Sequence, residues 1–160
     1  MFDPRDEIRD TLKAYLPAGQ ERKGIIFHDD RGDEHPVDVH LWEAKVNSFE
    51  EGGKLGLENP QMALLSLISS TSRNLDIGGG CRTHIGLIDV HIFLVKDERW
   101  SAETIKQEVS SNIENCIRAS QKTVSGCNFV ECINGRDLDP LKQSLGVRRI
   151  IGIRATGDCS

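Results

Sequence analysis

Two stretches of the chain place apolar residues at the spacing of an amphipathic helix. The first is predicted over residues 4–16, where Asp3-Pro4 suits a helix start and Pro17 suits a helix end. The second begins after Ser101, a good N-terminal cap, and runs to about residue 120. Its apolar stripe consists of Ile105, Val109, Ile113, Cys116 and Ile117. Each helix therefore has one face to bury against another layer of the fold.

Two other stretches alternate apolar and polar residues and share one pattern. VDVHLW at 37–42 and IDVHIF at 88–93 both have the form apolar-Asp-Val-His-aliphatic-aromatic. Alternate residues of a strand share a face, so the apolar positions of both segments are predicted to face the core. The opposite face then carries two acids, two imidazoles and two aromatic rings, namely Asp38, His40, Trp42, Asp89, His91 and Phe93.

Further strands are predicted from short apolar runs that lie between turn-forming residues. We expect one at 24–27 and two near the C-terminus, at 127–133 and 147–155. Residues 62–74 suit either a helix or a strand, because apolar positions at helical spacing occur beside many Ser and Thr residues. We favour a strand that forms a long hairpin across the glycines at 78–80.

The order helix, strands, helix, strands predicts an α+β fold, with a mostly antiparallel sheet flanked by two main helices. The chain has 160 residues, of which 38% are hydrophobic and 28% are charged, and this is enough for one hydrophobic core. Residues 1–160 are therefore expected to form a single domain. Mobile loops are expected at 28–36, 46–60 and 76–82, where turn formers and glycines gather.

Charge and composition narrow the classes of function. The net charge of -5 disfavours binding to nucleic acid through bulk electrostatics, and we expect no direct sequence-specific nucleic-acid binding. The N-terminal residues do not have the form of a signal peptide, and no apolar run approaches the roughly 20 residues that span a bilayer. The protein is therefore expected in the cytosol, with no membrane partner.

The cysteines and glycines give no pattern of a known catalytic site. Five cysteines in a cytosolic setting favour free thiols. An offset of five would place Cys127 and Cys132 on opposite faces of one strand, so we interpret both as packing residues. Cys81 follows three glycines, but no His-bearing motif around it supports a catalytic thiol. The glycine run also lacks the Lys-Ser/Thr of a phosphate loop, and we predict no catalytic residue and no cofactor.

The face that combines acids, imidazoles and aromatic rings admits three interpretations. If the two strands are neighbours in register, Asp38, His40, Asp89 and His91 converge on a divalent metal, with further ligands from the His/Asp-rich loop at 28–35. Alternatively, the face is exposed to solvent, or it is covered by another subunit or by a helix. We favour a covered face, because aromatic rings are enriched at interface cores. The predicted interface residues are Asp38, His40, Trp42, Asp89, His91 and Phe93.

One local pattern and the order of elements suggest a family. The strand IDVHIFLV at 88–95 enters the capped helix SAETIKQEVSSNIENCI at 101–117, and two strands follow, ending near VRRIIGIRA. Together with the amphipathic N-terminal helix, this resembles the tail-terminator and tail-completion proteins of long-tailed bacterial and archaeal viruses and related prophages. The resemblance covers residues 5–156 as architecture. The insertion at 46–60 and the cluster HDDRGDEH depart from it.

The resemblance implies a small α+β subunit that assembles into a homo-oligomeric ring, commonly a hexamer, which caps the tail tube and meets the head connector. Such a subunit is a structural protein of the virion, present in the host cytoplasm during assembly, and not an enzyme. The alternative is a small metal-dependent enzyme or metal-binding domain that uses the paired Asp-x-His strands. A regulatory or small-ligand module of the same fold class also stays open.

Overall fold

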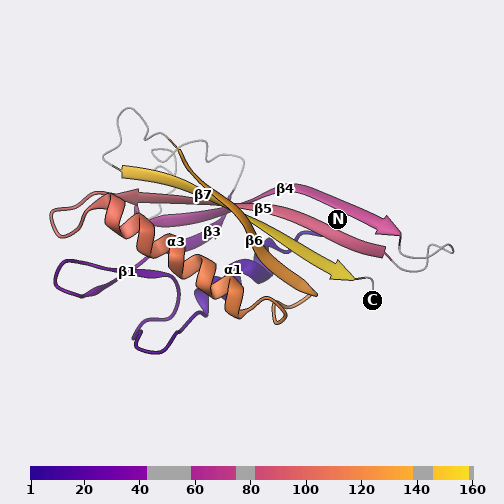
Figure 1. Ribbon diagram of the computed structural model, residues 1–160, viewed down its shortest axis with the longest axis horizontal. Coiled ribbons are helices and arrows are strands. Elements are labelled where there is room, and N and C mark those ends of the chain that lie inside the picture. The colour runs from indigo at the N-terminus through magenta and orange to yellow at the C-terminus, as the bar shows by residue number, and fades with distance from the viewer. Residues whose placement is uncertain (43–58, 75–81, 139–145, 159–160) are drawn as a thin grey trace.

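The computed structural model describes residues 1–42, 59–74, 82–138 and 146–158, and in these residues the chain forms two helices and seven strands (Figure 1). The helices are α1 (Arg5–Lys13) and α3 (Ala102–Ala119). The strands are β1 (Ile26–His28), β2 (Glu34–Pro36), β3 (Asp38–Leu41), β4 (Met62–Asn74), β5 (Arg82–Val95), β6 (Phe129–Leu138) and β7 (Gly146–Asp158). The predicted α+β class is confirmed.

Five strands form one sheet in the order β3-β4-β5-β7-β6, and β1 and β2 form a separate antiparallel pair. Strands β3 and β4 run parallel, whereas the other three pairings in the large sheet are antiparallel. Residues 62–74 are a strand, which pairs with β5 from Met62 opposite Phe93 to Asn74 opposite Arg82. The predicted pairing of these two segments is therefore confirmed. The glycines between them, and nearly all of the loops expected at 46–60 and 76–82, lie outside the described residues.

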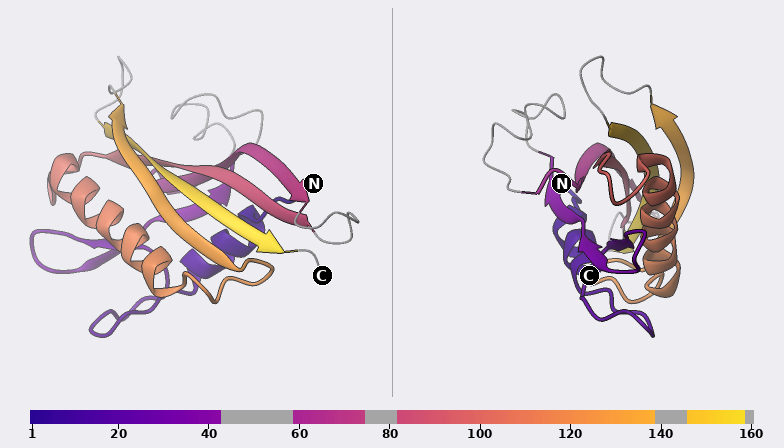
Figure 2. Two further views of the ribbon diagram at one scale, coloured as in Figure 1. Left: turned by 45° about the vertical axis from the view of Figure 1, so that its right-hand side comes forward. Right: turned by 90° about the vertical axis from the view of Figure 1, so that its left-hand side faces the viewer.

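Both helices pack on the same face of the large sheet, and the left view of Figure 2 shows them beneath it. Ile8 of α1 and Ile113 of α3 are fully buried there, in one cluster with Val90 and Ile151 of the central strands. The alternation read from the sequence holds, because Val39 and Val90 belong to this core while their polar neighbours do not. The opposite face of the sheet carries no helix among the described residues.

Both helix starts and the end of α3 lie within one residue of the prediction, whereas α1 ends at Lys13, three residues before the predicted 16. Helix α1 begins at Arg5, whose backbone N–H donates to Asp3 Oδ1 at 3.2 Å. Ser101 occupies the N-cap position of α3 in an extended conformation, but its hydroxyl makes no capping hydrogen bond. The start of α3 is fixed instead by the preceding Trp100, whose indole Nε1 donates to the carbonyl of Val95 at 2.9 Å.

The segment 28–36, predicted as a mobile loop, includes strand β2 and packs against the body of the protein. Its His35 ring lies 4.8 Å from the ring of Trp100, and Phe27 of β1 meets the same indole edge-on at 4.9 Å. Asn112 of α3 donates its side-chain N–H to the carbonyl of Ile26 at 2.7 Å. The small hairpin is therefore held by α3 and by the turn that precedes α3.

Candidate functional site

The two Asp-x-His strands are not neighbours, because β4 lies between them. The two histidines lie in one row of paired residues across the sheet: His40 of β3 is opposite Leu64 of β4, and Leu64 is opposite His91 of β5. Strands β3 and β5 run in opposite directions, so the two copies of the pattern are reversed relative to each other. Asp38 of β3 therefore shares its row with Phe93 of β5.

This separation bears on the metal interpretation. Neighbouring strands lie about 4.8 Å apart, so the backbone positions of His40 and His91 are about 10 Å apart. A zinc ion needs each imidazole nitrogen at about 2.0–2.1 Å. In the described part of the chain, no group of three or more His, Cys, Asp or Glu side chains is arranged to hold a metal ion. The convergence that would follow from adjacent strands is not formed.

The aromatic residues of the pattern pack together on the helix-free face. The ring of Trp42 lies 4.6 Å from the ring of His91 and 6.0 Å from that of Phe93. Phe93, Met62 and Leu64 are each 1% exposed and form a second, smaller apolar cluster. Trp42 is partly buried against this cluster. The sheet therefore has an apolar cluster on both faces. Phe93 packs beneath Trp42 and is itself almost fully buried.

His91 is a partly buried polar member of this face. Its Nε2 lies 3.0 Å from the hydroxyl of Ser66, and its Nδ1 is buried without a hydrogen-bond partner in the described structure. Burial lowers the pKa of His91 below its ordinary value, although the nearby Asp89 carboxylate acts in the opposite direction. The imidazole is therefore held in its neutral form near pH 7.

The outer part of the same face is open to solvent. The side chains of His40 and Asp38 are 40% and 42% exposed, and His40 Nε2 lies 3.9 Å from Asp38 Oδ2. The guanidinium of Arg148 on β7 lies 5.2 Å from the centre of the Phe93 ring. The predicted interface residues thus occupy one continuous face, of which Asp38, His40 and part of Trp42 are accessible to a partner. Their role as an interface stays a prediction.

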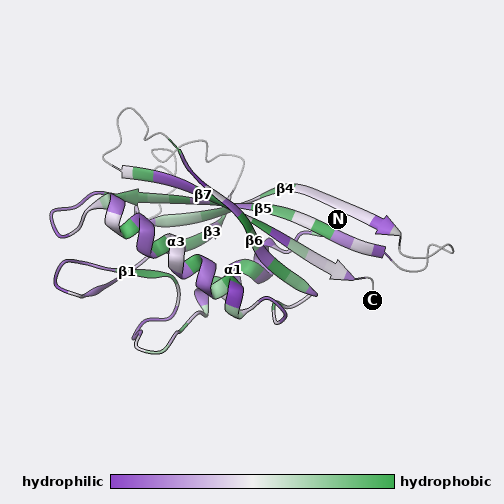
Figure 3. Ribbon diagram, viewed as in Figure 1, coloured by the Kyte–Doolittle hydropathy of each residue, from purple (hydrophilic) through white to green (hydrophobic). Residues whose placement is uncertain are grey.

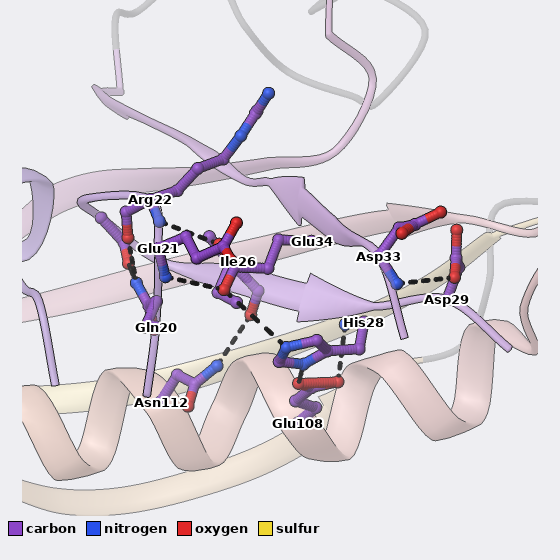
Figure 4. Close-up of polar contacts among 11 residues, drawn as sticks. Gln20, Glu21, Arg22, Ile26, His28, Asp29, Asp33, Glu34, Glu108 and Asn112 are labelled. Carbon is purple, nitrogen blue, oxygen red and sulfur yellow. Dashed lines mark hydrogen bonds and ion pairs between the residues drawn. The ribbon is translucent and has the colours of Figure 1, made fainter. Parts of the chain in front are cut away.

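The His/Asp-rich loop uses its charged groups to hold the small hairpin (Figure 4). His28 donates its backbone N–H to one oxygen of Glu108 at 2.9 Å, and its Nδ1 lies 2.7 Å from the other. The Glu34 carboxylate accepts the backbone N–H groups of Glu21 and Arg22, each at 2.9 Å, and these bonds lower the pKa of Glu34.

Asp29 closes the turn between β1 and β2. It accepts a hydrogen bond from His35 Nε2 at 2.9 Å, and its other oxygen accepts the backbone N–H groups of Arg31 and Asp33. The bond from His35 comes first among the causes that lower the pKa of Asp29 to about 2. Asp29 and Glu34 therefore use their carboxylates to hold the turn and the segment before β1.

The thiols in the described structure are packing groups. Cys116 is buried in α3, and burial raises its pKa and that of Cys127 to about 11 and that of Cys132 to about 12. The expectation that Cys127 and Cys132 lie on opposite faces of one strand is wrong, because Cys127 precedes β6 and both pack against the same core. Cys81 lies outside the described residues.

Two open edges of the large sheet were not anticipated from the sequence. The pairing of β4 with β3 ends at Leu65, and from Ser66 to Asn74 no described strand covers the outer side of β4. One hydroxyl in this part, that of Ser70, donates to the carbonyl of Phe2 at 2.7 Å. Figure 3 shows β4 pale and then purple toward its end, as expected for a strand that becomes polar. A signal was present in the sequence, since residues 66–72 read SLISSTS with no charge.

The second open edge is the outer side of β6. The backbone N–H of Val130 donates to the carbonyl of Gln121 at 2.9 Å. Beyond it, no described strand pairs with the outer side of residues 131–138. Residues 133–137 are exposed, and a polar groove of about 390 Å³ runs between this edge and α3. Within the described residues, each side of the sheet therefore has one edge that no strand covers, and the two edges are built from different residues.

The directions of the two edge strands are complementary. Successive antiparallel pairings place β7 parallel to β4 and place β6 antiparallel to both. A second copy placed beside the first in the same orientation would therefore set its β6 antiparallel to β4 of the first. Antiparallel pairing is the arrangement that most of the sheet already uses.

Comparison with known proteins adds no relative. No family model matches the chain, and no curated protein matches it. Within the described residues, neither helix has the length and apolar character needed to cross a membrane.

Proposed function

We propose that the protein is a structural subunit, not an enzyme, that joins copies of itself head to tail into a closed ring of the tail-terminator type. The observation that carries the proposal is one sheet with two unlike edges that no described strand covers, β4 beyond Leu65 and β6 on the other side. If each copy offers one edge to each of its two neighbours, every contact is heterologous. Heterologous contacts give a ring when the rotation between copies closes.

A symmetric dimer is the simplest competing assembly. A two-fold axis that joins β4 to β4 would use one edge of each copy and leave both β6 edges open. Open strand edges are templates for further pairing, and soluble proteins shorten, charge or cover them. Head-to-tail assembly uses both edges of every copy, so it leaves none uncovered once the ring closes.

In the tail-terminator role, the ring would cap a tail tube and contact a head connector. The helix-free face, with Asp38, His40 and Trp42 partly exposed, is available to such a protein partner. The net charge of -5 suits a protein partner better than DNA, because acidic surfaces repel phosphates that pass nearby.

Native mass spectrometry of the purified protein, in a volatile buffer without chelator, tests the ring. We expect one closed species, and for six copies a mass of about 107 kDa, six times the 17.8 kDa subunit. No excess mass from a metal should be present. A monomer or dimer that carries a divalent ion would contradict the proposal and would favour the metal-binding alternative.

The terminator role needs a separate test. Adding the protein to polymerising tail-tube protein of the same virus should stop tube growth and place one ring at a tube end, as seen by electron microscopy. Tubes that grow without limit and remain uncapped would leave the ring without this role.

A further inference from the structure

Each open edge carries one exposed isoleucine, and in both cases it is the extra residue of a β-bulge. In β4 the register passes from Leu67 to Ser69, so Ile68 is the inserted residue. In β6 it passes from Cys132 to Asn134, so Ile133 is inserted. Ile68 is 57% exposed and Ile133 is 43% exposed. The other large apolar residues exposed in the described chain are Met1 and Leu16, so the two edges hold half of this set.

The two bulges lie at the same level of the sheet. One row of paired residues crosses four strands as Leu67, Ile88, Ile153 and Cys132. Ile68 follows the first residue of this row, and Ile133 follows the last. The two isoleucines are therefore within about one residue of the same height along the strands, roughly 3.4 Å. They lie on opposite sides of the sheet, since β4 and β6 are separated by β5 and β7.

Equal height has a consequence for assembly. A closed ring has no rise between neighbouring copies, whereas a filament has a constant rise. When the rows of the sheet lie across the ring axis, two patches that meet in a ring must lie at the same height on the subunit. Ile68 and Ile133 meet this condition to within about one residue, roughly 3.4 Å.

The composition of the β4 edge also favours a second copy as its occupant. Residues 66–72 contain no Lys, Pro or acidic side chain, the residues that commonly guard an exposed edge. The β6 edge has its nearest acid neutralised, because Glu131 forms an ion pair with Arg154 of β7. The residues that flank each isoleucine, Leu67 and Ser69 in β4 and Cys132 and Asn134 in β6, are uncharged, and the nearby Glu114 and Arg118 that line the groove belong to α3.

We propose that Ile68 of one copy packs against Ile133 of the next, with the outer edge of β4 lying along the outer edge of β6. This inference rests on the proposed ring and specifies the contact that closes it. The groove between β6 and α3, which Ile133 lines, provides space beside that residue for the neighbouring strand. The contact joins two different edges, so no residue in it contacts the same residue of the neighbouring copy.

Charge substitutions test this contact. Ile68→Glu and Ile133→Lys each place an unpaired charge in the junction, and each alone should raise the protein concentration needed for half assembly by about tenfold or more. A 1:1 mixture of the two variants should assemble again. It can build alternating rings, in which every second junction pairs the introduced glutamate with the introduced lysine and the others keep Ile68 against Ile133.

The readout is mass against concentration by light scattering, with circular dichroism melting to show that each variant is folded. Leu16→Glu is the matched control, because Leu16 is 48% exposed but lies outside both edges, and its assembly should be unchanged. If both edge variants assemble like the parent, the contact is wrong while the ring can still stand. If only Ile68→Glu fails and the mixture does not recover, a β4-to-β4 dimer replaces the head-to-tail contact. If the parent is monomeric throughout, the proposed function fails as well.

Discussion

Trp100 is the residue whose truncation should most clearly weaken the packing of the β1–β2 hairpin against the main core and lower the free energy of unfolding. Its side chain is 7% exposed and is surrounded by the rings of Phe27 and His35. Its indole Nε1 donates to the carbonyl of Val95, where β5 ends, and the guanidinium of Arg99 lies 4.7 Å from its ring. One side chain thus connects the β1–β2 hairpin, the end of β5 and the start of α3.

The cost of Trp100→Ala follows from these contacts. Truncation of a buried Trp to Ala costs about 3–5 kcal/mol in transfer and cavity free energy. The aromatic pairs contribute about 0.5–1.5 kcal/mol and the indole hydrogen bond a similar amount, and both are partly contained in that range. The carbonyl of Val95 keeps a second, longer hydrogen bond from Gln61 Nε2 at 3.5 Å, so it is not left bare. We therefore expect about 3–5 kcal/mol for Trp100→Ala and about 1–2 kcal/mol for Trp100→Phe.

Urea unfolding followed by far-ultraviolet circular dichroism measures these differences, with all proteins at one concentration so that assembly contributes equally. Arg99→Ala is the matched control, because the side chain of Arg99 is 58% exposed and its loss should change stability far less than loss of the indole. A loss below about 1 kcal/mol for Trp100→Ala would refute the reasoning that this indole anchors the hairpin.

Three further outcomes follow from the described geometry. Because the folded pKa of His91 is lowered by burial, the unfolded chain takes up a proton first as the pH falls below about 6.5, and stability should drop by at most about 1.4 kcal/mol per pH unit. His91→Gln should remove that part of the pH dependence in urea titrations, and an unchanged slope would contradict it. Alkylation at pH 8 should leave Cys116, Cys127 and Cys132 unmodified until the protein unfolds, as read by peptide mass spectrometry, since burial raises the pKa of all three; rapid labelling of the folded protein would count against this packing. A Cβ on Gly152 would meet Oδ1 of the exposed Asn134 side chain, which can rotate away, so Gly152→Ala should cost less than about 1 kcal/mol, and no more in an Asn134→Ala background; a loss above about 2 kcal/mol that Asn134→Ala relieves would contradict this freedom of Asn134.

Much of the fold could be predicted from local periodicity. The stripe from Ile105 to Ile117 specified α3 because every third or fourth residue on a helix shares a face. The alternation in 88–95 specified which side of β5 meets the helices, since a slip of one residue would bury Asp89 and His91 in the main core. These features depend on neighbours along the chain, and a single sequence contains that information.

The features that decide the candidate site depend on pairings between distant segments. Nothing in the repeated Asp-x-His pattern indicates that β4 inserts between its two copies, or that β3 runs parallel to β4. Which strands border the sheet follows only from that order, so the open edges could not be recognised in advance. The uncharged SLISSTS run indicates an edge available for pairing only once it is known that no described strand covers the outer side of β4 there.

Hydrogen–deuterium exchange at two protein concentrations tests most directly whether these edges join copies. Backbone N–H groups that point outward from residues 66–73 of β4 and 131–137 of β6 should exchange rapidly in the dilute protein. We expect both segments to become protected together when the protein is concentrated enough to assemble, while exchange at the exposed turn around Gly32 does not change. Assembly that leaves both edges exchanging at the dilute rate would contradict the account, because the copies would then be joined through another surface.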